Sequence, residues 1–168
     1  MKRLARSLKY IAGILLIAAT SAGVYLFLHK TPVVPAKFTK VTTFVIFYPT
    51  KSSGAAINQA SFKYGTDSKV LSFLVSQSGI NMTVAEQATP QGFIDIPQAY
   101  DKLIESLNGY AEFGSYYGTV NLTHPKEFNG QQSAALNAKG TLMFVHPTNG
   151  QLSQDQWKVF FNNLQTIQ

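Results

Sequence analysis

The chain has 168 residues, no cysteine, only 13% charged residues and a formal net charge of +6. The charge is uneven, because six cations precede residue 38 whereas eight lysines balance eight acids from Phe38 to Gln168. The lack of cysteine excludes a disulfide scaffold and a thiolate nucleophile, and the neutral remainder argues against nucleic acid as a partner.

An uncharged segment from Tyr10 to Leu28 follows a basic head, residues 1–9. Its nineteen residues would make a helix of roughly 28 Å, close to the roughly 30 Å hydrocarbon core of a bilayer. We therefore predict a single-pass transmembrane helix that spans the cell membrane, with the N-terminus cytoplasmic because the head is basic. A cleaved signal peptide is the alternative, since small residues gather at 18–23, but the segment is longer than a typical signal sequence.

The rest of the chain divides into a linker and a domain. Residues 29–40 contain Pro32 and Pro35, which predict an extended spacer. Residues 41–168 are enough for one hydrophobic core, so we predict a single extracytoplasmic domain.

The first half of this domain has the residue patterns of β-strands. Aromatic and β-branched residues predict a strand over 41–48, alternating patterns predict strands over 57–64 and 80–85, and a strongly apolar segment predicts a strand over 70–76. Short turns join the last three strands, which indicates an antiparallel meander.

The second half mixes helices with strands. Apolar residues at helical spacing predict a helix over 95–107 that begins at Asp95. Strand character over 110–122 is interrupted by glycines, which predicts a turn or bulge, and residues 131–137 and 141–146 form a predicted hairpin with a bulged turn.

The last helix has the clearest local signal. Ser153 and Gln156 fit a capping box, and an apolar stripe follows at Trp157, Phe160, Phe161 and Leu164. The predicted fold is therefore α+β, an antiparallel sheet with two helices packed on one face, preceded by the single transmembrane helix.

No motif indicates catalysis, a cofactor or a metal site. His124 lies three residues before Glu127, but a metal would need a further ligand, and His146 ends a predicted strand. Serines occur without the nucleophile-elbow motif, although a triad assembled by the fold is not excluded. We predict no catalytic residue, cofactor or metal.

Aromatic residues are concentrated between residues 100 and 128, and exposed rings can bind glycans or anchor a protein partner. The predicted partner-binding residues are Tyr110, Tyr116, Tyr117 and Phe128. Because Tyr116 and Tyr117 are adjacent in a predicted strand, one of them should face outward.

Several segments together resemble a family of small membrane-anchored outer domains of unknown function from Saccharibacteria-type candidate-phylum bacteria. They are the basic head with its anchor and proline-containing spacer, 45–49, 70–76, 80–87, 117–120, 141–145 and the helix over 152–164. The resemblance implies a cell-envelope location and no catalytic residues.

Three functions follow as hypotheses. The leading one is a non-catalytic domain, anchored in the lipid bilayer through residues 10–28, that binds a protein or cell-wall glycan. The first alternative is an envelope hydrolase that uses His124 or His146. The second alternative is a carrier that holds a lipid or glycan between the sheet and the helices.

Overall fold

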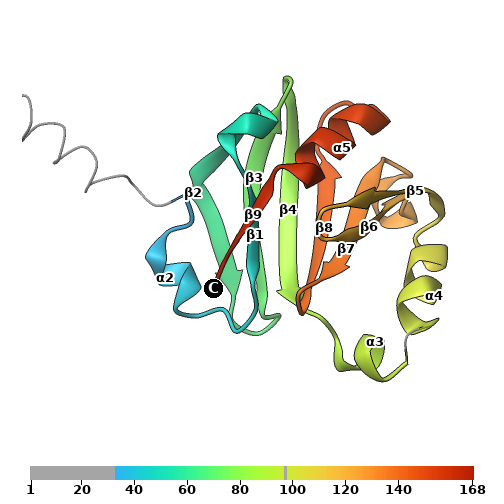
Figure 1. Cartoon of the computed structure of the whole chain (residues 1–168), viewed down its shortest axis with the longest axis horizontal. Helices are drawn as coiled ribbons and strands as arrows, with labels where there is room; N and C mark the ends of the chain where they lie inside the picture. The colour runs from blue at the N-terminus through green and yellow to red at the C-terminus, as the bar shows by residue number, and fades with distance from the viewer. Residues whose placement is uncertain (1–32, 97) are drawn as a thin grey trace, which may run out of the picture. The chain divides into compact units, whose positions relative to one another are not determined.

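The computed structural model of the chain describes residues 33–96 and 98–168 (Figure 1). The basic head and the predicted transmembrane segment lie outside the described residues. Within the described residues, every helix is too short or too polar to cross a bilayer.

Short helices and longer strands alternate irregularly along the domain. The elements in chain order are α2 (Ala36–Thr39), β1 (Ile46–Pro49), η1 (Lys51–Ser53), β2 (Ala55–Gly65), β3 (Val70–Gln77), β4 (Ile80–Ala88), α3 (Gln91–Asp95), α4 (Gln98–Ser106), β5 (Gly109–Ser115), β6 (Gly118–Thr123), η2 (Lys126–Phe128), β7 (Ser133–Ala138), β8 (Thr141–Pro147), α5 (Gln154–Asn162) and β9 (Leu164–Ile167).

Seven of the strands form one antiparallel sheet in the order β2-β3-β4-β8-β7-β6-β5, and β1 pairs with β9 in a separate ribbon. The α+β class and the β2-β3-β4 meander are confirmed. The predicted strand over 41–48 is shorter and shifted, since β1 begins at Ile46 and includes Pro49. Strand β9 was not predicted.

The hydrophobic core lies on the face of the sheet that α5 and the β1-β9 ribbon cover (Figure 1). Trp157, Phe160 and Phe161 of α5 are fully buried there. The predicted capping box is present, because the Ser153 hydroxyl accepts from the Gln156 N–H and the Gln156 side chain accepts from the Ser153 N–H. The buried stripe and the cap together fix where α5 begins and which side it presents.

The two amphipathic helices pack on opposite faces of the sheet, not on one face as predicted. Phe113 of β5 contacts Phe161 of α5, whereas Asn121 of β6 bonds to Tyr100 of α4. Phe113 is paired with Val120, the neighbour of Asn121, and successive residues of a strand point to opposite faces. Periodicity identifies a helix's apolar side but not the face of the sheet that receives it.

The predicted helix over 95–107 is two helices. Asp95 ends α3 instead of capping the helix, and Ile96 has extended backbone with φ −129° and ψ 89°. A residue that precedes a proline avoids the helical region, and this separates α3 from α4.

The domain begins at Val33, earlier than the predicted boundary at Val41. Val34 and Phe38 are buried in the core, and the Phe38 ring stacks on Phe62 with centroids 5.5 Å apart. Residues 33–40, predicted as linker, therefore belong to the folded domain. Only residues 29–32 remain between it and the uncharged segment.

The β5-β6 and β7-β8 turns lie beside glycines as predicted, but the β7-β8 turn is of another type than predicted. Residues 116 and 117 form the turn between β5 and β6, as the interrupted strand pattern indicated. The β7-β8 hairpin has no bulge, because Ala138 pairs with Thr141 and the two residues between have positive φ, 49° at Lys139 and 73° at Gly140. Positive φ at both central positions is the geometry of a two-residue type I′ turn.

Candidate functional site

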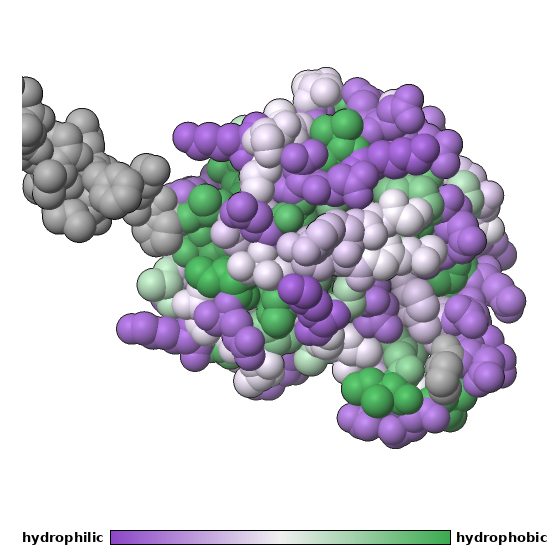
Figure 2. Space-filling view, in the orientation of Figure 1, coloured by the Kyte–Doolittle hydropathy of each residue, from purple (hydrophilic) through white to green (hydrophobic). Residues whose placement is uncertain are grey.

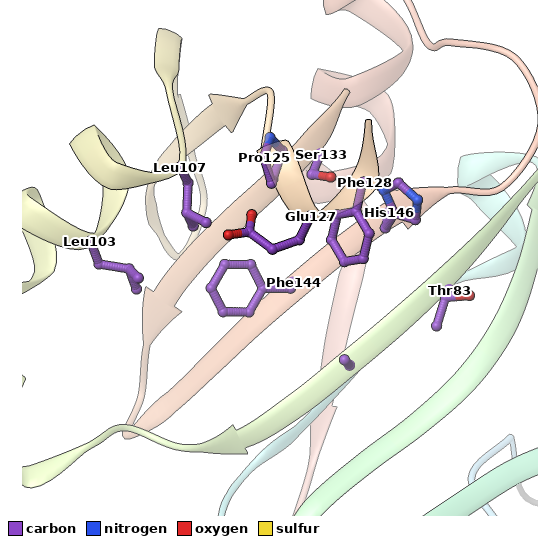
Figure 3. Close-up of a pocket in the computed structure, with 10 residues that line it drawn as sticks. Thr83, Leu103, Leu107, Pro125, Glu127, Phe128, Ser133, Phe144 and His146 are labelled. Atoms are coloured by element: carbon purple, nitrogen blue, oxygen red, sulfur yellow. Dashed lines mark hydrogen bonds between the residues drawn. The ribbon is translucent and has the colours of Figure 1, made fainter. Parts of the chain in front are cut away.

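A cavity of about 440 Å³ lies on the face of the sheet opposite the core (Figure 3). Strands β4, β7 and β8 provide its floor, α4 one wall, and the loop containing η2 another. The lining residues are Thr83, Ala85, Leu103, Leu107, Pro125, Glu127, Phe128, Ser133, Phe144 and His146.

The floor follows from strand alternation. Ala85 pairs with Phe144, while the preceding rung pairs Val84 with Val145. Val84 and Val145 are buried in the core, so Ala85 and Phe144 point the other way, into the cavity. The small side chain of Ala85 leaves the space that a larger residue would occupy.

The wall formed by α4 is held in place by Tyr100. Its hydroxyl accepts a hydrogen bond from the Asn121 side chain at 3.3 Å, and its ring packs edge-on against Phe93 at 5.7 Å. Burial raises the pKa of Tyr100, so the hydroxyl stays protonated at neutral pH. Leu103 of α4 and Leu107 just after it, predicted as part of the helix's apolar side, line the cavity.

Polar groups gather at one end of the cavity. His146 pairs with Thr83 across the sheet, and its Nδ1 lies 2.9 Å from the Ser133 hydroxyl. The ring of Phe128 stacks on the His146 ring with centroids 4.0 Å apart. Figure 3 shows Thr83 and His146 at one end and the α4 leucines with Phe144 at the other.

Desolvation lowers the pKa of His146, and a hydrogen bond with the Gln132 backbone partly opposes this. The imidazole is therefore neutral at neutral pH. A neutral imidazole beside a hydroxyl can donate and accept hydrogen bonds without adding charge.

Glu127 is the one carboxylate among the cavity's lining residues. The residue is exposed, and Figure 3 shows its carboxylate directed over the cavity between the leucines and Phe128. Among residues 33–96 and 98–168, the single ion pair joins Asp155 to Lys158, so Glu127 has no cationic partner there.

His124, a candidate from the sequence, lies outside the cavity lining. Its Nδ1 is 2.8 Å from the Gly130 carbonyl, and its ring stacks on Tyr110 at 4.4 Å. No group of three potential metal-ligating side chains occurs in the described part of the chain. His124 thus holds the β6-β7 loop against β5.

The four predicted partner-binding residues are spread over the domain. Phe128 lines the cavity, and the Tyr110 hydroxyl accepts a hydrogen bond from Gln132 at 2.7 Å. Tyr116, 83% exposed, lies at the other end of the β5-β6 hairpin, where Tyr117 packs edge-on against Phe47. Tyr116 faces outward, but it lies with Tyr117 in a turn and not in the strand predicted for them, and the four residues do not form one surface.

Sequence reasoning missed Ser133 and the cavity itself. Ser133 has no motif around it, and its contact with His146 depends on the register of the β7-β8 hairpin. A correct two-residue turn would have placed Ser133 opposite His146, which is the signal that could have found the pair.

A second unusual group, Glu86, lies on the core side of β4. It is fully buried, and both of its carboxyl oxygens are 3.2 Å from the Phe47 N–H. Desolvation raises the pKa of Glu86 well above its ordinary value of 4.5, although the hydrogen bond from Phe47 opposes this. Because Glu86 lies on the core side, the sheet separates its carboxyl from the cavity. Its hydrogen bond with Phe47 links β4 to the ribbon instead.

Comparison with protein families, curated proteins and solved structures found no match to this chain. The resemblance to membrane-anchored outer domains stays a prediction. The cavity is therefore the main observation on which a function can be argued.

Proposed function

We propose that this domain binds one apolar chain of an uncharged amphiphile in the cavity between the sheet and α4. The observation that carries the proposal is the cavity's almost wholly apolar wall, made by side chains such as Ala85, Leu103, Leu107 and Phe144. Concave apolar sites with a few convergent polar groups are the common form of small-ligand sites. This corresponds to the carrier hypothesis from the sequence.

The size of the cavity supports a ligand of the dimensions of an acyl chain. A water molecule takes about 30 Å³ of liquid, so about 440 Å³ has room for roughly fifteen atoms of similar size. Water in an apolar cavity finds few hydrogen-bond partners. An apolar ligand that fills the cavity would instead remove hydrocarbon surface from solvent.

The polar end supports an uncharged head group. Neutral His146, which is partly exposed and held by the buried Ser133 hydroxyl, can hydrogen-bond an ester, amide or alcohol. Glu127 over the cavity would repel a carboxylate, and no cationic side chain is among the lining residues. A monoacylglycerol-like molecule therefore fits better than a fatty acid anion.

The membrane supplies such molecules, and we propose that the chain is anchored in it through residues 10–28. The domain starts at Val33, five residues after Leu28. At about 3.3–3.6 Å per residue, this length of chain spans at most roughly 18 Å. A bilayer-embedded anchor would thus keep the domain at the lipid surface.

Binding of a protein or wall glycan through exposed aromatic residues has less support. Tyr110 and Phe128 are engaged in stacking with His124 and His146, and Tyr116 is at the far end of the hairpin.

The test is photolabelling of the full chain in phosphatidylcholine vesicles with a monoacylglycerol that carries a diazirine in its acyl chain. Peptides would be mapped by mass spectrometry. We expect label at Leu103, Leu107 or Phe144, in addition to label within 10–28. Absence of label from all cavity-lining peptides would overturn the proposed function.

Two variants and one control make the test specific. Ala85→Phe and Leu107→Phe place bulk in the cavity and should abolish cavity labelling, while Val159→Phe changes an exposed position on α5 and should leave it intact. The fluorescence of Trp157, the single tryptophan, reports whether each variant is folded. Cavity labelling that persists in both folded filling variants would contradict the assignment.

A second candidate function, hydrolysis, is favoured by the hydrogen bond between Ser133 and His146. It ranks second because Ser133 is only 1% exposed and no described carboxylate bonds to His146. We expect long-chain esters to bind without turnover. Ester cleavage that Ser133→Ala abolishes would instead make the domain an esterase.

A further inference from the structure

The most exposed aliphatic side chains of the described residues lie together where α3 joins α4. Ile94 is 60% exposed and Ile96 is 57% exposed. We call Phe93, Ile94 and Ile96 the tip. Figure 2 shows an apolar patch at the lower edge of the domain, where Figure 1 places α3.

We propose that the tip inserts into the lipid bilayer and holds the cavity close to the membrane surface. This inference rests on the proposed function, and it names the bilayer itself as the source of the ligand.

The tip is continuous with the cavity. Phe93 packs against Tyr100 of α4, and α4 leads to Leu103, which lines the cavity. Leu103 follows Ile96 by seven positions, and from Gln98 to Leu103 α4 rises only about 7.5 Å. A lipid chain that leaves the bilayer at the tip would therefore cross only a short distance to reach the cavity wall.

The charges around the tip favour apolar contact over attraction to anionic lipid. The charged residues between Thr89 and Asn108 are Asp95, Asp101, Lys102 and Glu105, which sum to −2. Asp95 also accepts a hydrogen bond from Gln91 at 2.8 Å within α3. A tip of three uncharged, apolar side chains should enter neutral bilayers, and salt should not weaken this contact.

The sequence that precedes the domain is a reason to expect the bilayer, and not another partner, to cover this patch. Its uncharged segment ends at Leu28, and residues 29–32 are too few to carry the domain far from a membrane that holds this segment. Within the domain, α2 near its start lies apart from α3 (Figure 1), so the tip would provide a second point of contact.

The absence of cysteine allows a direct test. Ile94→Cys and Ile96→Cys in the full chain, labelled with a nitrobenzoxadiazole probe in phosphatidylcholine vesicles, should show blue-shifted emission and quenching by spin-labelled lipid. Val159→Cys on α5, distant from α3 in Figure 1, is the control and should show neither. High salt and added anionic lipid should leave the difference unchanged.

Two further outcomes decide the inference. Ile94→Asp, combined with the probe at residue 96, should remove the quenching; its retention overturns an apolar insertion, as does a water-like emission at both tip positions. Photolabelling of the cavity separates this failure from that of the proposed function: label in the cavity without a quenched tip would refute only the tip, and a quenched tip without cavity label would refute only the binding.

Discussion

Glu86 has an environment that few carboxyl groups share. It points into the core from β4, where it pairs with Leu71 of β3 on one side and Met143 of β8 on the other. Its carboxyl accepts a hydrogen bond from the Phe47 N–H. The protonated form is favoured there because burial disfavours charge. Phe47 belongs to β1, so this one carboxyl links the ribbon to the sheet.

The stability of the domain should depend on pH through Glu86. Its pKa in the folded state is above the ordinary 4.5, so its contribution is full below pH 4.5 and is lost as the pH rises through the folded-state pKa. Between pH 4.5 and the folded-state pKa of Glu86, the free energy of unfolding should fall by about 1.4 kcal/mol per pH unit. Glu86→Gln should remove this dependence, as measured by urea denaturation of the full chain in detergent, followed by Trp157 fluorescence.

The control for that measurement is Glu105→Gln, on the exposed side of α4, which should keep the pH dependence of the parent chain. A parent chain whose stability stays constant or rises above pH 4.5 would show that Glu86 is not a buried neutral carboxyl.

Glu127 should set the charge preference of the cavity. Glu127→Gln removes a negative charge over the lining, so the affinity for a long-chain fatty acid at neutral pH should rise by about 2- to 5-fold, the scale of an exposed ion pair. The affinity for the matching monoacylglycerol should stay the same. Competition against the diazirine probe measures both, and an equal change for the two ligands would contradict the electrostatic role.

Helices and strands were predicted reliably where the pattern lies in residues close together in the sequence. The capping box and the first three residues of the stripe lie within nine residues, and α5 formed as they indicate, although the predicted helix ran to Leu164, which belongs to β9. In contrast, β9 is a four-residue strand whose partner is more than 110 residues away, so no local pattern could reveal it. The face chosen by α4 also depends on contacts, such as Tyr100 with Asn121, that periodicity does not encode.

The cap of α5 should contribute measurably to stability. Ser153→Ala leaves the Gln156 N–H without its side-chain acceptor and should lower the free energy of unfolding by about 1 kcal/mol. Ser106→Ala removes only a hydroxyl that donates to the Leu103 carbonyl on an exposed turn and should change it by less than about 0.5 kcal/mol. Equal effects in the two variants, by urea denaturation, would show that the cap is not a specific contributor.

At the scale of the whole molecule, the fold class could be predicted but the site could not. Alternation and helical spacing report which residues are apolar, and Leu103 and Leu107 were identified as such. A cavity arises when apolar side chains fail to fill the space between elements, as beside Ala85. That depends on how far α4 stands from β4 and β8, which the chain pattern does not contain.

The β1-β9 ribbon should be essential to the whole domain. Removing residues 164–168 deletes the strand that β1 pairs with and the buried Leu164, and it should abolish cooperative unfolding. Removing Gln168 alone lies beyond the paired residues and should have little effect. Trp157 fluorescence during denaturation distinguishes the two truncated chains. A cooperative transition in the chain that lacks residues 164–168 would contradict this role of the ribbon.

Pairing of β1 with β9 also sets the order in which the polypeptide can mature. Ile46 pairs with Ile167, so β1 stays unpaired until residues more than 110 positions later have been synthesised. A chain that lacks β9 would therefore display β1 as an unpaired strand that quality-control proteases can recognise.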